Sequence, residues 1–232
     1  MISVKNLTKY YGDFQALKGI SFEIKSGEIV GILGPNGAGK STTLRILTCY
    51  FNPTSGDAII DGKSILDEEN NVKKIIGYLP ESAPLYNDMC VFDYLVYMAD
   101  IQELERSKLN ERLHYVVNVC GLKEVISKPI GELSKGYKQR VGLAGAIIHD
   151  PKILILDEPT NGVDSETIDI IYNILRDLNQ NKNISIIMVT HDIERVSKIS
   201  NRIFCFEEGN LMELNKEELE IELSHKHKHP HL

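Results

Sequence analysis

"GPNGAGKST", residues 34–42, is the segment from which the fold of this chain is most directly predicted. It fits the pattern G-x-x-x-x-G-K-[ST] and directly follows the apolar residues 28–33, which are typical of a buried strand. A helical pattern opens inside it and runs from Lys40 to about Cys49. A strand, a glycine-rich loop and a helix in this order predict a phosphate-binding loop.

The residue types in this loop suit a polyphosphate. Gly34, Gly37 and Gly39 allow the backbone to turn so that successive N–H groups point at phosphate oxygens. Lys40 supplies positive charge to the β- and γ-phosphates, and the Ser41 hydroxyl is placed for Mg²⁺. The alternative is a strand-to-helix turn without a chemical role, which the Lys40-Ser41 pair disfavours.

A second apolar stretch, "KILILDEPT" at residues 152–160, ends in two carboxylates. A buried strand over 153–157 would deliver Asp157 and Glu158 to the ligand-binding edge of a parallel sheet. We expect Asp157 to hold Mg²⁺, directly or through water, and Glu158 to orient or deprotonate an attacking water. Two solvated acids at a strand end are the alternative, which is weak beside the phosphate-binding loop.

The rest of the chain alternates between strand and helix patterns. Such alternation predicts an α/β fold with a mostly parallel sheet covered by helices. An N-terminal antiparallel β subdomain and an inserted helical lobe are expected beside this P-loop core. We expect strands over 2–7, 20–25, 28–33, 58–62, 75–79, 153–157, 185–190 and 202–206, mostly helical structure from about 87 to 130, and helices over about 134–148 and 165–179.

Composition excludes several classes of protein. The chain has 232 residues, a net charge of −7 and a pI near 5.5, which gives no support to nucleic-acid binding. No apolar run is long enough to cross a bilayer and no N-terminal leader is evident, so any membrane link is expected to be peripheral. The cysteines form no CxxC pair, which argues against a zinc site or a disulfide scaffold.

The C-terminal residues have a biased composition. "NKEELEIEL", residues 215–223, predicts a short acidic helix, and "HKHKHPHL" follows at 225–232. Four histidines at alternating positions could hold a transition metal, but Pro230 and the lysines disfavour a closed geometry. We expect a disordered tail or a cloning remnant.

Taken together, these motifs resemble the ATP-binding subunit of an ATP-binding cassette (ABC) transporter. The resemblance covers about residues 2–210, with several motifs in the order of the family. It implies that Tyr11 in "KYYGDFQAL" stacks on adenine, with Tyr10 as a rival. "LSKGY" at 133–137 matches the family signature, usually LSGGQ, "NGVD" at 161–164 places Asp164 toward the other subunit, and His191 matches a histidine that contacts the γ-phosphate.

The resemblance also implies a dimer in which the signature helix of one cassette caps the ATP held by the other. Ser134 and the N–H of Gly136 would bind the partner's γ-phosphate, and the helix N-terminus would add its dipole. The nucleotide-binding set expected from the resemblance and from the loop is Tyr11, Gly34, Pro35, Asn36, Gly37, Ala38, Gly39, Lys40, Ser41, Thr42, Ser134, Lys135, Gly136 and Asp164.

This sequence departs from the family pattern at two places. Lys135 and Tyr137 replace a Gly and the Gln of the usual signature, which leaves the backbone donors in place. In "GYLPE", Glu81 stands where the family usually has a Gln that binds Mg²⁺ or water; a carboxylate keeps the acceptor role but cannot donate. Because the family's Gln acts at the metal, we expect Glu81 there as well. Glu at this position together with "LSKGY" resembles the ABC-2 type exporters, so we expect export as the direction of transport.

The expected function is that of a Mg²⁺-dependent ATPase subunit, with Glu158 and His191 as catalytic residues. Its expected partners are a separate transmembrane permease and a second ATPase subunit at the cytoplasmic face of the membrane, without nucleic acid. The domain expected over 2–210 contains a helical lobe at about 82–150, and the acidic helix and histidine tail follow at 211–232. The alternative is a soluble cassette that acts as a scaffold or regulator rather than in transport.

Overall fold

The described strands form two sheets, one of four strands and one of six. The computed structural model describes residues 1–215 and 218–219, and the acidic helix and histidine tail expected at 215–232 lie almost wholly outside these residues. The described elements are β1 (Ile2–Tyr11), β2 (Phe14–Ile24), β3 (Ile29–Leu33), α1 (Lys40–Leu47), β4 (Ser55–Ile60), β5 (Lys63–Ser64), α2 (Glu69–Lys73), β6 (Ile76–Leu79), α3 (Val91–Ile101), α4 (Arg106–Val119), the 3₁₀ turns Lys123–Val125 and Ile130–Glu132, α5 (Lys135–Ile147), β7 (Ile153–Asp157), α6 (Ser165–Lys182), β8 (Ser185–Val189), α7 (Ile193–Ile199), β9 (Arg202–Glu207) and β10 (Asn210–Leu214).

The larger sheet carries the expected parallel core. Its order is β10-β9-β3-β8-β7-β6, and all neighbouring pairs are parallel except β9 with β10. Along β7, Leu154 and Leu156 join one hydrophobic core, whereas Ile153 and Ile155 join the other. Both faces of a parallel sheet must be covered, and this alternation explains why the strand is apolar throughout.

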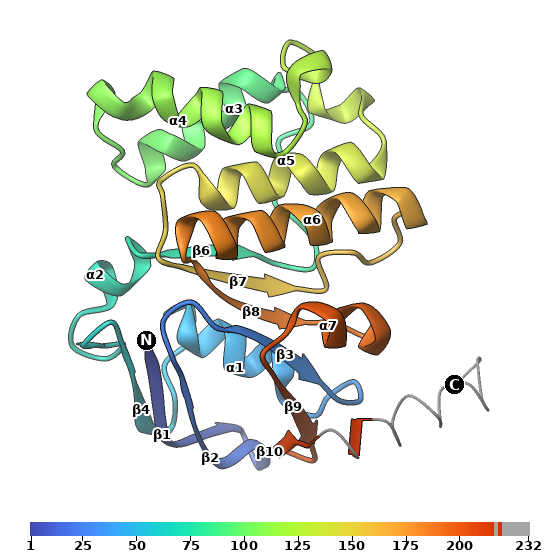
Figure 1. Cartoon of the computed structure of the whole chain (residues 1–232). Coiled ribbons are helices and arrows are strands. Elements are labelled where there is room, and N and C mark those ends of the chain that lie inside the picture. Colours follow the sequence, from blue (N-terminus) through green and yellow to red (C-terminus); the bar gives the residue numbers. More distant parts are fainter. Residues whose placement is uncertain (216–217, 220–232) are drawn as a thin grey trace.

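The two faces of this sheet are covered by different elements. On one face α5 and α6 pack against the sheet, and α3 and α4 lie beyond them at the top of Figure 1. On the other face lie α1 and the smaller antiparallel sheet, with strand order β2-β1-β4-β5. The segment 82–150, expected as an inserted lobe, contains α3, α4 and α5; its boundaries as a domain stay a prediction.

Several elements differ in extent from the expectation. β1 and β2 continue to a tight turn at Gly12 and Asp13, so each is longer than the apolar pattern indicated. α6 continues to Lys182 and ends at Asn183, which adopts a left-handed conformation. α7 and β10 were not expected, and β10 extends the sheet to Leu214. Among the described residues, no helix combines the length and the apolar character that crossing a membrane would need.

Candidate functional site

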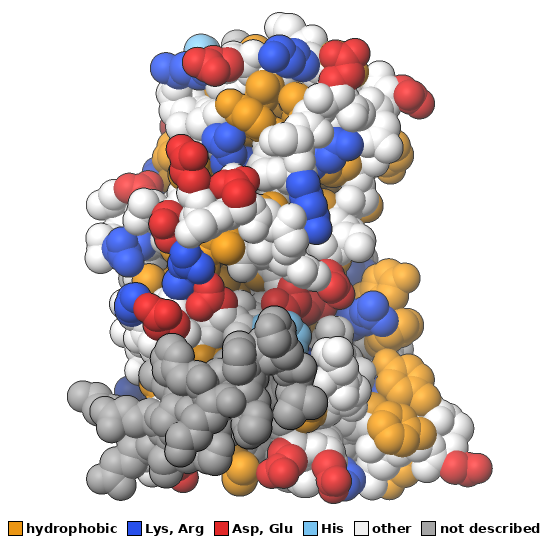
Figure 2. Space-filling view, turned by 90° about the vertical axis from the view of Figure 1, so that its right-hand side faces the viewer, with side chains coloured by type: hydrophobic (Ala, Val, Ile, Leu, Met, Phe, Trp, Pro, Cys, Tyr) orange, Lys and Arg blue, Asp and Glu red, His pale blue; other side chains and the backbone are white. Residues whose placement is uncertain are grey.

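The predicted metal-binding and catalytic residues and part of the phosphate-binding loop meet where the parallel strands end. β3 leads into the glycine-rich loop, β7 ends at Asp157, and β8 leads to His191. The arrowheads of β7 and β8 point to the right of Figure 1, and Figure 2 looks onto that side, where a histidine lies beside acidic side chains. A pocket of about 400 Å³ opens there; it is lined by Tyr11, Phe14, Ala16, Asn36, Gly37, Gly39, Lys40, Ser41, Thr42, Glu81, Asp157, Glu158, Asn161, Val189 and His191.

The glycine-rich loop is closed around the Lys40 side chain. The Lys40 ammonium donates hydrogen bonds to the carbonyl oxygens of Gly34 at 2.7 Å and Pro35 at 2.8 Å. Burial lowers its pKa, and the nearby carboxylates Glu158 and Asp157 oppose this effect. Gly34 has a φ of 135°, and a Cβ there would collide with the carbonyl oxygen of Phe206. The loop geometry therefore requires glycine at this position.

Two buried carboxylates stand at the floor of the pocket. Asp157 and Glu158 are 5% and 9% exposed. Burial raises the pKa of Asp157, and a hydrogen bond with Ser41 opposes this. Burial also raises the pKa of Glu158 to about 7, although the backbone N–H of His191 donates to it at 3.3 Å. A carboxyl that titrates near neutral pH is suited to accept a proton from water.

Glu158 and His191 form a direct pair. Nε2 of His191 lies 2.9 Å from Oε1 of Glu158. The backbone of Glu158 has a φ of 48°, in the left-handed region that non-glycine residues seldom adopt. Its N–H donates to the carbonyl oxygen of Val189 at 2.9 Å, which fixes this unusual backbone against the end of β8. Such local strain is common at functional sites.

The pocket residues fit a magnesium nucleotide. Ser41 and Asp157 both line the pocket, and their hydroxyl and carboxylate are oxygen ligands of the kind that Mg²⁺ takes together with phosphates and water. Glu81, expected at the metal, also lines the pocket, where its Oε1 accepts a hydrogen bond from Nδ2 of Asn161 at 3.0 Å. Within residues 1–215 and 218–219, no group of three or more His, Cys, Asp and Glu side chains is arranged to hold a metal ion.

The sequence left a choice between Tyr10 and Tyr11, and the pocket contains only the latter. Tyr11 lines it and is 42% exposed. Asn161, which sequence reasoning gave no role, lines it too, because the loop after β7 returns to this edge. Phe14 and Ala16 were also missed; they enter from β2 directly after the turn that follows Tyr11.

The signature stretch lies outside this pocket. Ser134, Lys135, Gly136 and Asp164 are absent from its lining, and so are Gly34, Pro35 and Ala38 of the loop. Ser134 caps α5 by accepting a hydrogen bond from the N–H of Tyr137 at 3.4 Å. The neighbouring cations of this stretch contact carbonyl oxygens of the same chain: Lys138 donates to Gly131 at 3.2 Å, and Arg140 to Cys120 at 3.1 Å and Gly121 at 3.0 Å.

Gly136 and Asp164 belong to one packed unit between α5 and α6. A Cβ on Gly136 would lie 2.6 Å from Oγ1 of Thr167, so the close approach of the two helices requires glycine. Asp164 caps α6: it accepts from the N–H and from the hydroxyl of Thr167, both at 2.9 Å. These contacts hold the pKa of Asp164 below its usual range.

Comparison with known proteins identifies related chains. The ABC transporter family profile matches residues 17–161. The "Spermidine/putrescine import ATP-binding protein PotA" of Thermotoga maritima is 33% identical over 213 residues, which cover 92% of this chain but only 58% of that protein. An uncharacterized ABC transporter ATP-binding protein of Methanocaldococcus jannaschii is 36% identical over 217 residues, covering 94% of this chain and 78% of that one.

Solved structures resemble this chain over nearly its whole length. The structure of cbiO1 from Clostridium perfringens, "Part of the ABC transporter complex cbiONQ", has a TM-score of 0.86 and 32% identity and covers 98% of this chain and 93% of that one. The ATP-binding cassette MJ0796, a dimer in "a post-hydrolysis state" bound to ADP and Pi, has a TM-score of 0.81 and 29% identity, with coverage of 93% and 99%. The expected α/β fold with its parallel sheet is thereby confirmed.

Proposed function

This chain belongs to the ABC transporter family of ATP-hydrolysing cassettes, and on that premise we propose that it powers transport through a separate membrane subunit. One observation carries the proposal: Lys40, Ser41, Asp157, Glu158 and His191 converge on one pocket at the ends of parallel strands. Convergence of a phosphate-binding loop, an acidic strand end and a buried carboxyl with a pKa near 7 suits phosphoryl transfer to water.

In the proposed reaction, Glu158 accepts a proton from the attacking water as that water bonds to the γ-phosphorus and ADP leaves. Nε2 of His191 lies 2.9 Å from Oε1 of Glu158, and His191, which lines the same pocket, is the proposed contact of the γ-phosphate. Lys40 lies beside the loop carbonyls, from which its ammonium turns to the β- and γ-phosphates. The adenine stacks on Tyr11, which lines the same pocket.

Ser41 and Asp157 are the proposed ligands of Mg²⁺, and Glu81 would bind the ion or accept from a water bound to it. When bound, this ion would neutralise charge on the phosphate oxygens. The chain's own contribution is the placement of these oxygens: Ser41 opens α1, Asp157 ends β7, and Glu81 follows β6. The proposed nucleotide contacts otherwise come from residues 34–42 of the loop, of which Asn36, Gly37, Gly39, Lys40, Ser41 and Thr42 line the pocket.

Ser134, Lys135, Gly136 and Asp164 are proposed to act on the nucleotide of a second cassette. They lie outside the chain's own pocket, which supports a site shared between two copies. The Ser134 hydroxyl accepts from the N–H of Tyr137 through a lone pair, so its own hydrogen is left for a phosphate oxygen. The dimeric state described for MJ0796 supports the same arrangement.

A membrane permease at the cytoplasmic face is the proposed partner. PotA is named as an import ATP-binding protein, and cbiO1 is described as part of a transporter complex. Export, suggested by Glu81 and the signature, stays a prediction that the import name of PotA does not support. The scaffold or regulator alternative is not favoured, since the named relatives serve transport.

A mixing experiment tests the shared site. Lys40→Ala removes the phosphate contact of the loop, whereas Ser134→Asp keeps the cap on α5 but places negative charge against the partner's phosphate. Each variant alone should hydrolyse ATP slowly. A mixed dimer contains one pocket in which both parts are intact, so mixing should restore activity above the sum of the two variants.

The control is Ser134→Asn, which caps α5 equally well and carries no charge. It should retain far more activity than Ser134→Asp. Absence of restored activity on mixing, combined with wild-type turnover per chain that does not change on dilution, would refute a shared site. The transport role is tested separately: the native protein should co-purify with a polytopic membrane protein, and purification with soluble partners only would contradict it.

A further inference from the structure

Tyr11 is held by an aromatic and cationic group that does not itself line the nucleotide pocket. The Phe51 ring meets the Tyr11 ring nearly edge-on, with centroids 6.3 Å apart and an interplanar angle of 78°. The Lys9 ammonium lies 5.4 Å from the centroid of Tyr11 and 5.6 Å from that of Phe51. Tyr11 lines the pocket but Lys9 and Phe51 do not, so these two contact the tyrosine from outside it.

The group joins two parts of the chain that are distant in sequence. Lys9 and Tyr11 are on β1, whereas Phe51 follows α1, the helix that begins at Lys40. The Lys9 ammonium also donates to the carbonyl oxygen of Asn52 at 2.6 Å, which ties the strand to the segment after the helix. Because α1 lies between the phosphate-binding loop and Phe51 in the chain, this helix fixes Phe51 relative to the loop.

Phe51 is itself held by its neighbours. Its backbone N–H donates to the carbonyl oxygen of Arg45 at 3.2 Å, and the Arg45 guanidinium lies 5.9 Å from its ring centroid. Tyr50, 71% exposed, packs on it at a centroid distance of 4.8 Å. Phe51 is half-buried and packs against the core beneath the antiparallel sheet. The ring of Phe51 is therefore held in place where it contacts the ring of Tyr11.

We propose that Phe51 and Lys9 are positioning residues that fix the Tyr11 ring for stacking on the base of the nucleotide and so set the base-dependent part of nucleotide affinity. The inference rests on the proposed function, in which Tyr11 stacks on adenine. A half-exposed tyrosine at a strand end would otherwise sample several rotamers, and immobilising it on binding would weaken the complex. An edge-on ring and a cation restrict the ring before the nucleotide binds.

The proposal separates base recognition from phosphate recognition. ATP uses the Tyr11 ring and the loop, whereas inorganic tripolyphosphate uses the loop alone. Phe51→Ala and Lys9→Ala should therefore weaken binding of ATP, by about three- to ten-fold for Phe51→Ala, and leave binding of tripolyphosphate unchanged. Titration calorimetry with Mg²⁺ present measures both ligands on the full chain. Phe51→Leu keeps apolar bulk and serves if Phe51→Ala fails to fold.

Matched controls and a double variant complete the test. Phe92→Ala removes an exposed phenylalanine from α3, and Lys5→Ala removes an exposed lysine from the same strand as Lys9; neither should change ATP binding. If Phe51 acts through Tyr11, then Phe51→Ala should have no further effect in the Tyr11→Ala background. A residue that only stabilises the fold would instead weaken binding additively.

The chain contains no tryptophan, so Tyr11→Trp introduces a single reporter. Its emission should change with ATP and not with tripolyphosphate, and Phe51→Ala should reduce that change. Equal weakening of ATP and tripolyphosphate by Phe51→Ala, or no weakening of either, would overturn the inference. The proposed function fails separately, if wild-type protein binds neither ligand or if Lys40→Ala binds tripolyphosphate as well as wild type does.

Discussion

Replacing Glu158 with Gln should stabilise the fold while it lowers the catalytic rate by orders of magnitude, and the stabilisation should depend on pH. Burial raises the pKa of this carboxyl from its ordinary value of 4.5 to about 7. The folded chain therefore holds the proton more tightly than the unfolded chain does. The stability that the protonated carboxyl contributes is complete below about pH 4.5 and is lost as pH rises through about 7. The neutral amide of Glu158→Gln does not ionise, so the variant does not lose this stability as pH rises.

The magnitude follows from the pKa difference. Each pKa unit corresponds to about 1.36 kcal/mol, so ionised Glu158 disfavours the folded state by roughly 3 kcal/mol once pH is well above 7. Between about pH 6 and about pH 8.5, the change in this contribution is roughly 1.5 kcal/mol. Glu158→Gln should therefore exceed wild type in free energy of unfolding at both pH values, and by roughly 1.5 kcal/mol more at the higher one.

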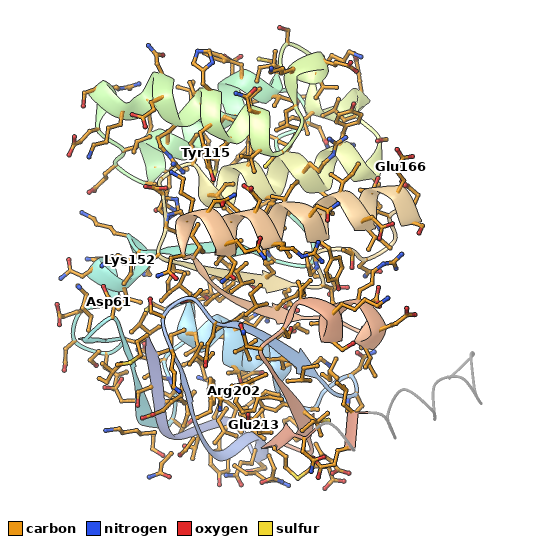
Figure 3. The ribbon with its side chains drawn as sticks, in the orientation of Figure 1. Asp61, Tyr115, Lys152, Glu166, Arg202 and Glu213 are labelled. Atoms are coloured by element: carbon orange, nitrogen blue, oxygen red, sulfur yellow. The ribbon has the colours of Figure 1, made fainter. Side chains whose placement is uncertain are left out.

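Urea unfolding without nucleotide at these two pH values measures the difference. Glu166→Gln is the matched control, because Glu166 is an exposed carboxylate in the first turn of α6, on the side of the molecule that carries the site (Figure 3). Its replacement should cost a few tenths of a kcal/mol at both pH values through the helix dipole. A stability difference between Glu158→Gln and wild type that is the same at both pH values would refute the reasoning about burial.

Three further predictions concern the same edge of the sheet. With saturating MgATP, Glu158→Gln should lower kcat by about 10²–10⁴-fold. Glu81→Gln should keep much of the rate, because an amide oxygen still accepts from Asn161. Turnover by Glu158→Gln near the wild-type rate would exclude Glu158 as the base. The wild-type kcat should rise with pH through about 7, as Glu158 loses its proton, and phosphate release that is flat over this range would contradict that. Asp164→Ala should cost about 1 kcal/mol in urea unfolding through loss of the α6 cap, whereas Asp164→Asn should cost little; equal losses would show that capping is not its role in the isolated chain.

The centre of the site could be predicted from the sequence because its signals are local. A loop with glycines at fixed spacing, followed by Lys40 and Ser41, requires a strand before it and a helix after it. An apolar strand ending in Asp157 and Glu158 must be buried on both faces, so its end falls at the same edge. The structure places all four of these residues at one pocket.

What could not be predicted depends on contacts between distant segments. Asn161 reaches Glu81 only because the loop after β7 folds back beside β6. Phe51 reaches Tyr11 only because the segment after α1 packs on β1. The Lys152–Asp61 pair, at 2.6 Å on the opposite side of the molecule (Figure 3), likewise joins residues that no local pattern relates. The periodicity of apolar residues and the secondary-structure propensities carry no information about such pairs.

The N-terminal ends of α5 and α6 are packed together through Thr167. This contact relates the residues of the proposed shared site to one another. Gly136, two residues after the Ser134 cap, packs directly on Thr167, and Thr167 donates both of its hydrogen bonds to Asp164. Under the proposed function, we expect a phosphate that draws Ser134 toward a partner chain to displace Thr167 and Asp164 with it, since close-packed helices shift together rather than deform. On the far side of Asp164, Arg195 donates to Ser165 at 3.0 Å and to Asp192 at 3.0 Å, next to His191. We therefore propose that binding at the signature of one cassette is linked, through these packed residues, to His191, which pairs with Glu158 in the same chain.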